Sequence, residues 1–356
     1  MDTARDSPLD VGLLQELLAT YGPCGREEAV RAVCARELEG VVDALWTDPA
    51  GNLVARVDGA GRAPATTVTA HLDELSMIVK RVEPDGRLHV EQLGTMYPGN
   101  FGLGPVAVLG DHRELTAVLA LGSEHTTRES ARIWETKPDG GDRALDWDHV
   151  SVFTGCSPEQ LAEAGVHAGT RVCVHRSKRT LVEFGEHLGC YFLDDRAAVA
   201  ALLRTARELA AGPRPAGDVH LLFSSTEEMG GIGAAYAART LPAETTISLE
   251  VGPAEPEYAT TVGPAPIVAY RDAAVVYDAA LADRLLALGR RLGTPPTPAV
   301  FSSFESDASN AKASGQTARA GLLCLPTLST HGYEVVHRGA IAACADLLTA
   351  HLREPG

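Results

Sequence analysis

Two adjacent glutamates, Glu227 and Glu228, are the residues whose types and placement most strongly invite chemistry. They follow the apolar run 219–223, which predicts a buried strand, and they precede Gly230 and Gly231, which are typical of a turn that opens a helix. Open α/β sheets hold their ligands at the carboxyl ends of such strands. One glutamate could therefore hold a metal ion while the other transfers a proton. The alternative is a solvated loop with two acidic residues, and the pair alone does not decide between them.

More residues of metal-binding types occur at the ends of other predicted elements. Strands are predicted over 66–70, 245–249 and 321–325, and a strong helix over 197–209. The polar residues that precede or follow these elements are His71, Asp73, Asp194, Glu250 and His331. A doubly wound sheet brings the ends of its strands together in one crevice. The glutamate pair joins His71, Asp194, Glu250 and His331 at these ends. Two imidazoles with three carboxylates form the ligand set expected of a hydrolase that uses two zinc or two cobalt ions to activate a shared water.

Several of these residues also have a purely structural interpretation. Asp194 and Asp195 stand at the start of the predicted helix, where acidic side chains commonly cap the first turn. His71 and Asp73 could form an ordinary turn at a strand end, although a carboxylate two residues from a histidine can also orient its imidazole on a metal. Cys24 has no base beside it in the sequence, so we do not expect it to act as a nucleophile.

A polar stretch at 126–148 predicts a long surface excursion. Four side chains in or beside this stretch could bind a metal by type, namely His125, Asp146, Asp148 and His149. They have neither the tight spacing of a metal site nor a place at a strand end. We therefore expect a solvated loop or a subunit contact there.

The composition favours a cytoplasmic protein that binds neither nucleic acid nor a membrane. The 356 residues are 45% hydrophobic and 22% charged, the net charge is -16, and the 31 basic residues form no long run of the kind that binds a phosphate backbone. The 7 cysteines lack the spacing of a zinc knuckle or a disulfide framework, which favours a reducing compartment. The sequence starts without the apolar core of a signal peptide, and no apolar run is long enough for a membrane helix.

The length suits one large domain with an insertion. Residues 1–78 and 186–356 predict an α/β catalytic domain with a doubly wound mixed sheet, including helices over 27–38 and about 335–352. Residues 79–185 consist of short alternating runs separated by turn residues, and they predict an inserted, small β-rich domain.

Four stretches resemble the signatures of one known family. They are 71–74, 193–196, 226–234 and 326–336, and they are joined by weaker matches at 22–28, 47–53 and 164–169. In order and spacing they are similar to the tetrahedral, self-compartmentalising aminopeptidases, the glutamyl, lysyl and leucyl aminopeptidase family once mislabelled as endoglucanases. The resemblance covers almost the whole chain, and its specificity lies in the order of the motifs rather than in any single one.

The resemblance implies a zinc-peptidase type of fold and a role for each matching residue. The implied ligands are His71 and Glu250 for one metal, Glu228 and His331 for the other, and Asp194 as the bridge between them. Glu227 would be the general base that takes a proton from a metal-bridging water and returns it to the leaving amine, and Asp73 would support His71. The inserted domain would join two chains, and dimers would assemble into a tetrahedral dodecamer.

Some residues depart from the family pattern and leave the substrate open. Glu250 stands where the family more often has Asp, residues 327–330 lack the usual Arg-Tyr, Gly332 and Tyr333 replace the usual Ser-Pro, and 304–308 differ from the usual Gly-Thr-Asp-Ala. The leading hypothesis is a metal aminopeptidase that trims small peptides from the N-terminus. A metal amidase or deacylase for one peptide-like metabolite is the close alternative, and a non-catalytic assembly protein that keeps the fold is the distant one.

Overall fold

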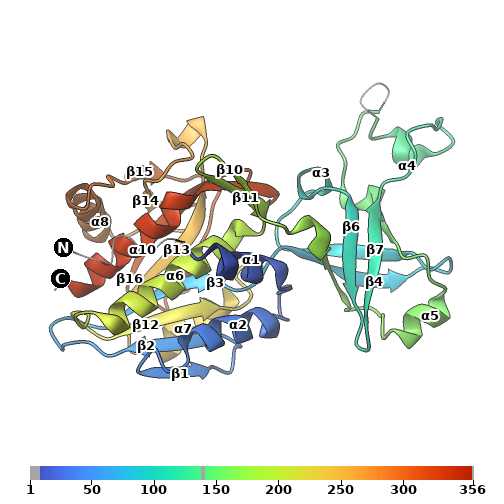
Figure 1. Ribbon diagram of the computed structural model, residues 1–356. Helices are drawn as coiled ribbons and strands as arrows, with labels where there is room; N and C mark the ends of the chain where they lie inside the picture. The colour runs from blue at the N-terminus through green and yellow to red at the C-terminus, as the bar shows by residue number, and fades with distance from the viewer. Residues whose placement is uncertain (1–8, 138–140, 355–356) are drawn as a thin grey trace. The chain divides into compact units, whose positions relative to one another are not determined.

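The computed structural model describes residues 9–137 and 141–354, which form two compact units (Figure 1). The first unit comprises Met1–Glu74, Leu181–Thr330 and Glu334–Gly356, and the second comprises Leu75–Thr180 and His331–Tyr333. The first unit is therefore discontinuous in sequence. The inserted domain was predicted to span residues 79–185, and these bounds lie a few residues from the observed Leu75 and Thr180.

An eleven-stranded mixed sheet forms the centre of the first unit, within the described part of the chain. Its strands are β1 (Ala44–Thr47), β2 (Leu53–Val57), β3 (Thr66–His71), β10 (Val182–Phe184), β11 (His187–Tyr191), β12 (Val219–Ser224), β13 (Thr245–Pro253), β14 (Ile267–Arg271), β15 (Thr297–Val300), β16 (Arg319–Leu328) and β17 (Tyr333–His337). The order is β1-β2-β12-β3-β13-β16-β17-β11-β10, and β14 joins β15 to β16. The four central strands β12, β3, β13 and β16 are parallel, so their carboxyl ends share one edge.

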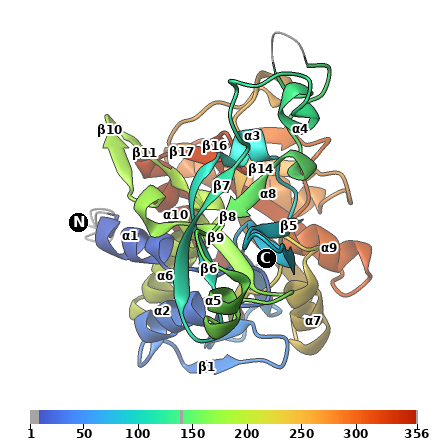
Figure 2. The ribbon, with the colours of Figure 1, turned by 90° about the vertical axis from the view of Figure 1, so that its right-hand side faces the viewer.

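Helices cover both faces of this sheet, as expected for a doubly wound fold. They are α1 (Val11–Ala19), α2 (Glu28–Leu38), α6 (Leu193–Ala211), α7 (Ile232–Thr240), α8 (Ala279–Arg291), α9 (Asp307–Ala313) and α10 (Arg338–Arg353), with one 3₁₀ turn, η3 (Pro256–Tyr258). Figure 2 shows α1, α2 and α6 on one side of the sheet and α7 and α9 on the other. The central helix α6 packs on β2, β3 and β13 through small side chains such as Ala197, Ala198 and Ala201, all of them buried.

The second unit contains a closed six-stranded barrel in the order β4-β5-β8-β7-β6-β9. Its strands are β4 (Ser76–Val82), β5 (Leu88–Leu93), β6 (Gly104–Leu109), β7 (Glu114–Ala120), β8 (Ser151–Phe153) and β9 (Arg171–Val174). Its short helices are α3 (Pro98–Phe101), α4 (Ala131–Trp134), α5 (Pro158–Glu163), η1 (Trp147–His149) and η2 (Arg176–Lys178). Alternate residues such as Leu88, Val106 and Val172 are buried and fill the barrel. The expectation of an α/β sheet domain with a separate β-rich insertion is confirmed.

Several predicted element boundaries were wrong. The last helix was expected to begin near residue 335, but Val335 and Val336 lie in β17 and α10 begins at Arg338. The strand expected to end before Glu250 continues to Pro253, because β13 pairs with β16 as far as Thr327. The excursion 126–148 contains α4 and the buried Trp147, and its residues 138–140 lie outside the described part.

No helix within residues 9–137 and 141–354 combines the length and the apolar character that crossing a membrane requires.

Candidate metal centre

The carboxyl ends of the central parallel strands bring most of the predicted site residues together. His71 is the last residue of β3 and is in register with Ser224, the last residue of β12. Glu227 and Glu228 lie in the loop that follows β12, and Glu250 lies within the neighbouring strand β13. The sequence pattern therefore located this edge of the sheet correctly.

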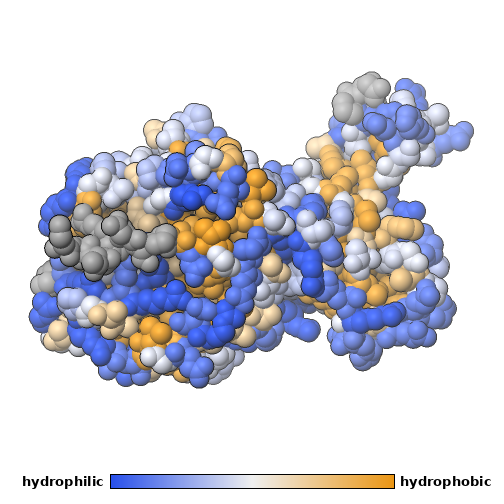
Figure 3. All heavy atoms as spheres, viewed as in Figure 1, coloured by the Kyte–Doolittle hydropathy of each residue, from blue (hydrophilic) through white to orange (hydrophobic). Residues whose placement is uncertain are grey.

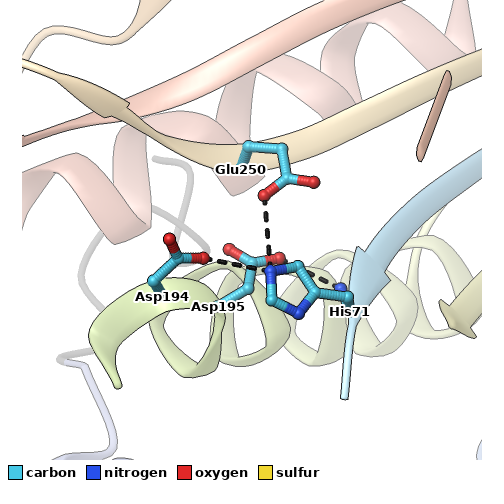
Figure 4. A group of neighbouring side chains, drawn as sticks. All are labelled: His71, Asp194, Asp195 and Glu250. Carbon is cyan, nitrogen blue, oxygen red and sulfur yellow. Dashed lines mark hydrogen bonds and ion pairs between the residues drawn. The ribbon is translucent and has the colours of Figure 1, made fainter. Parts of the chain in front are cut away.

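His71 is the centre of a buried group that also contains Asp194, Asp195 and Glu250 (Figure 4). Its Nε2 atom lies 3.0 Å from Oδ1 of Asp194 and 3.8 Å from Oε2 of Glu250. On the other side of the ring, Nδ1 lies 3.2 Å from the main-chain oxygen of Asp73, to which it can donate a proton. That hydrogen bond fixes the tautomer in which Nε2 carries the lone pair, which is the form that binds metals.

The geometry of this group fits a metal ion. One ligand atom from each of the four side chains lies within 4.8 Å of all the others. Nitrogen and oxygen ligands that share one zinc ion at about 2.0–2.2 Å lie roughly 3–3.5 Å apart when they are neighbours around it. The contact between His71 Nε2 and Asp194 Oδ1 has this length. Without a cation, His71 must carry a second proton to face these carboxylate oxygens favourably.

The charges at the site also favour a bound cation. Burial is the main cause that raises the pKa of Asp195 and of Glu250, and their negative neighbours raise the pKa of each further. Burial acts to lower the pKa of His71, but hydrogen bonds to Asp194 and Asp73 raise it well above its usual value. Burial and the surplus of negative charge together disfavour ionised carboxylates at this group, and the same surplus favours a protonated His71. A divalent ion at the group would allow these carboxylates to be ionised and His71 to be neutral.

Two buried oxygens of the group provide a further indication. Oδ1 of Asp195 and Oε1 of Glu250 make no hydrogen bond to any described residue, although neither is accessible to solvent. Leaving a buried polar atom without a partner costs about 1–3 kcal/mol, and more for a charged group. An oxygen-and-imidazole set of this kind suits zinc or cobalt. The residues present therefore fit the metal that the sequence predicted at His71, Asp194 and Glu250.

Asp73 connects this group to the two adjacent glutamates. Its Oδ1 accepts the backbone N–H of Glu227 at 2.9 Å, and its Oδ2 accepts the backbone N–H of Glu228 at 3.1 Å. Oδ2 also accepts the thiol of Cys24 at 3.2 Å, and Oδ1 lies 3.5 Å from Nδ1 of His71. Burial acts to raise the pKa of Asp73, but these hydrogen bonds outweigh it and lower the pKa. Asp73 is thus an ionised anchor for both the imidazole and the glutamate loop.

The loop that carries the glutamates depends on unusual backbone conformations. Thr226 has φ 58° and Gly231 has φ 64°, and the N–H groups of Gly230 and Gly231 both donate to the main-chain oxygen of Glu227. A Cβ atom on Gly231 would lie 2.8 Å from Cβ of Asn310 in α9. Only glycine fits both the backbone conformation and the space there. The tight turn keeps the side chains of Glu227 and Glu228 at the end of β12.

Burial is the main cause that raises the pKa of Glu227, and the charges of Asp307, Glu228 and Asp73 raise it further. The same cause raises the pKa of Glu228, followed by the charge of Asp194. A carboxylate whose pKa is raised toward neutrality is better suited to accept and return a proton than an ordinary glutamate. The role of Glu227 as a general base stays a prediction.

Two acidic residues at the site were missed by the sequence analysis. Asp195 was considered only as a helix cap, but its Oδ2 accepts the backbone N–H of His71 at 3.1 Å. Asp307, the first residue of α9, is fully buried and accepts hydrogen bonds from the hydroxyls of Thr69 and Ser224. Its place beside Asp194 could have suggested that Asp195 belongs to the site. The only sequence signal for Asp307 was its place in the stretch 304–308, which differs from the family motif.

The remaining candidates have different places. His331 groups with the second unit, where its Nδ1 donates to the main-chain oxygen of Thr95 at 2.6 Å, again leaving the lone pair on Nε2. Its role as a metal ligand stays a prediction.

His149 accepts the backbone N–H of Asp146 in a local cap, and among the described residues no metal-binding group includes either. Burial raises the pKa of the Cys24 thiol, which keeps it protonated and unsuited to be a nucleophile.

Known proteins resemble this chain in both sequence and fold. Residues 51–347 match the family model described as M42 glutamyl aminopeptidase. The lysyl aminopeptidase of Pyrococcus furiosus is 28% identical over 246 residues, which are 68% of this chain and just under two thirds, 66%, of that protein.

Solved structures share the fold over nearly the whole chain. An aminopeptidase from the archaeon Desulfurococcus kamchatkensis superposes with a TM-score of 0.85 at 22% identity, covering 96% of this chain and 94% of the other. The TET1 peptidase of Pyrococcus horikoshii superposes with a TM-score of 0.84 at 21% identity, covering 97% of this chain and 99% of the other. The expected zinc-peptidase type of fold and the expected family are both confirmed. The chain therefore belongs to the M42 glutamyl aminopeptidase family, whose members are peptide hydrolases.

Proposed function

We propose that this protein is a dinuclear metal-dependent aminopeptidase that removes N-terminal residues from small peptides. The observation that carries the proposal is the anchoring of His71 and of the Glu227–Glu228 loop by one buried carboxylate, Asp73. This arrangement holds a metal-binding group and a candidate base beside each other. Membership of a peptidase family supports the reaction class.

The proposed ligands divide into two sets that share one residue. His71, Asp194 and Glu250 would hold one ion, and Asp194, Glu228 and His331 would hold the other. Two bound zinc or cobalt ions would polarise the scissile carbonyl and make the attacking water more acidic. Asp195 would keep the main chain of His71 in place through its hydrogen bond to that N–H.

Glu227 would move the proton during the reaction. Its raised pKa would let it accept a proton from the attacking water and then give that proton to the nitrogen of the leaving amine. The hydrogen bond from its own backbone N–H to Asp73 would keep the main chain of Glu227 in place during both transfers. The surplus of negative charge around the site would also attract the free ammonium group of a peptide substrate.

The second unit would join two copies of the chain. Hydrophobic residues gather over β6 and β7 in Figure 3, and Leu103, Val118 and Phe153 are exposed. Exposed apolar patches of this kind are typical of contact surfaces. The TET1 peptidase of Pyrococcus horikoshii can assemble into a tetrahedron or a large octahedral shell. A dodecamer of this 37.5 kDa chain would have a mass of about 450 kDa, which light scattering would detect.

The cytoplasm is the compartment that we propose. None of the seven cysteines forms a disulfide bond, in keeping with the reducing environment expected from their spacing.

A metal amidase or deacylase with one dedicated peptide-like substrate is the second candidate. Glu250 and the divergent residues around His331 favour it, because they stand at or beside the proposed ligands. The test is hydrolysis of a panel of aminoacyl-anilides and peptides by protein loaded with zinc or cobalt. Release of N-terminal residues supports the aminopeptidase, and a metal-loaded protein that cleaves no member of the panel favours the amidase.

A further inference from the structure

A cavity of about 250 Å³ lies at the edge of the sheet opposite the candidate metal centre. Its lining includes the first residues of the four central parallel strands, which are Thr66, Val219, Thr245 and Arg319. The strand β3 runs from Thr66 at this cavity to His71 at the metal centre, a distance of roughly 17 Å at 3.3 Å per residue. The cavity is therefore a separate site within the first unit.

Two oppositely charged side chains line the cavity without pairing. The backbone N–H of Arg319 donates to the main-chain oxygen of Glu244 at 3.1 Å, so the two residues are neighbours. Yet neither side chain makes a hydrogen bond or an ion pair with any residue in 9–137 or 141–354. Both residues are exposed, and an exposed cation and anion on neighbouring residues can each receive an opposite charge from the same small ligand.

Two further charged residues line the cavity, one positive and one negative. Arg284 of α8 lines the cavity, and its hydrogen bonds include one of 2.9 Å to the main-chain oxygen of Glu354. Asp278 caps α8 by accepting the N–H of Leu281 on Oδ1, which leaves its Oδ2 without a hydrogen bond to the residues that the structure describes. The α8 and α10 helices lie side by side here (Figure 1).

His351 of α10 is a third kind of polar group in the lining. Its Nδ1 is buried and has no hydrogen-bond partner within the described residues. Leaving such an atom without a partner costs about 1–3 kcal/mol. A neutral imidazole nitrogen can accept from an ammonium group or donate to a carboxylate.

We propose that this cavity binds a small zwitterion with one ammonium and one carboxylate group, such as a free α-amino acid. The carboxylate would lie on Arg284 and Arg319, the ammonium on Glu244 and Asp278, and His351 would contact one of the two. The volume is smaller than that of common ligand pockets, which restricts the ligand to a few heavy atoms beyond these groups. A simple anion would gain the arginines but would be repelled by the two carboxylates.

Isothermal titration of the full chain with glycine, acetate and ethylammonium tests this proposal. The protein is first freed of metal with a chelator, which is then removed by dialysis, so that the proposed catalytic centre does not contribute. We expect saturable binding of glycine at one site per chain, and binding at least about tenfold weaker for acetate and ethylammonium, because each of these meets only half of the site.

Variants identify the site and the sign of its charges. Arg319→Gln and Glu244→Gln should each weaken glycine binding by about tenfold, since each removes one charged contact. Arg239→Gln, at an exposed position on α7, is the matched control and should change nothing. Absence of saturable glycine binding would overturn the proposal. Acetate that binds as tightly as glycine, together with tighter binding in Glu244→Gln, would also overturn it by showing a plain anion site.

Discussion

Asp73 illustrates how much one buried carboxylate contributes to this site. It contacts the imidazole of His71 and accepts the two consecutive N–H groups of Glu227 and Glu228. Cys24 adds a third donor to the same carboxylate. The position of the proposed base and the orientation of the proposed metal ligand His71 are therefore coupled through one residue. A mutation of Asp73 would disturb both, so it cannot separate proton transfer from metal binding.

Glu227→Gln separates the two roles more cleanly. Glutamine keeps the shape and the backbone N–H that donates to Asp73, but it cannot accept a proton. We expect metal content close to that of the wild type and a turnover that is lower by at least about a hundredfold. Elemental analysis and steady-state kinetics on the same preparation measure both quantities. A variant with undiminished turnover would show that Glu227 is not the base.

Asp194→Ala tests the shared ligand. Asp194 is the carboxylate nearest to Nε2 of His71, at 3.0 Å, and its backbone N–H donates to the buried Glu334 at 2.8 Å. Loss of a bridging carboxylate removes an oxygen from both proposed ions, so we expect both to be lost. Asp58→Ala, at an acidic residue beside Arg56, is a control that should retain them. Two ions per chain in Asp194→Ala would exclude Asp194 as the bridge.

The sequence could indicate that these residues lie near one another where their position followed from the end of a strand. His71 and Glu250 come together because β3 and β13 are neighbouring parallel strands, and Asp194 joins them from the start of α6. Asp195 was interpreted only as a cap, since its inward direction depends on the backbone at the start of α6, which no periodicity reveals. Asp307 lies on α9, far along the chain from β3 and β12, and its carboxylate accepts hydrogen bonds from the hydroxyls of Thr69 and Ser224 on those strands.

Among the elements, α6 connects the candidate metal centre to the rest of the first unit. Arg196 in its first turn is fully buried and pairs with the fully buried Glu74 at 2.9 Å. Its guanidinium also donates to the main-chain oxygens of Leu17 and Leu72. The helix is thereby connected to α1 and to the segment that follows His71.

Arg196→Met should lower the free energy of unfolding by about 3–5 kcal/mol, because it removes the guanidinium that pairs with the buried charge of Glu74. Arg36→Met is the matched control. Arg36 pairs with Glu16 at 2.8 Å, but both side chains are exposed, so its loss should cost less than about 1 kcal/mol. Urea unfolding of both variants measures the difference. Equal effects would mean that the buried pair does not hold α6 in place.

The C-terminal helix α10 should make stability depend on pH. Burial, followed by the charge of Arg284, lowers the pKa of His351 from 6.5 to about 4. Between these values the unfolded chain binds a proton at this residue and the folded chain does not. Acidification therefore favours unfolding, and the contribution of His351 to stability falls by about 2 kcal/mol from pH 7 to pH 5.

Comparison of the wild type with His351→Gln isolates this contribution, because glutamine does not titrate. Urea unfolding at both pH values should show a smaller loss of stability in the variant. Parallel curves for the two proteins would mean that His351 titrates normally in the folded state.

Element boundaries were predicted less reliably than element types. The apolar residues Val335 and Val336 suit a helix by spacing, but pairing of β17 with the end of β16 places them in a strand. The strand β13 passes Glu250 because β16 continues beside it. Both outcomes depend on partners distant in sequence, which local pattern cannot supply.

For the whole molecule, the sequence predicted a sheet domain interrupted by a β-rich insertion, and the two units have that character. What it could not predict was the closure of the inserted strands into a barrel, since closure depends on the pairing of β4 with β9 across nearly the whole insertion. The assembly of the chain likewise depends on surfaces that periodicity does not identify.

The most direct test of a metal-dependent aminopeptidase is one hydrolysis experiment on a pair of peptides. A short peptide with a free amino terminus and its N-acetylated counterpart are incubated with the zinc- or cobalt-loaded protein, before and after chelation. We expect release of the N-terminal residue from the free peptide only, loss of this activity on chelation, and recovery when metal returns. Cleavage that survives chelation, or that proceeds equally on the acetylated peptide, would contradict the proposed function.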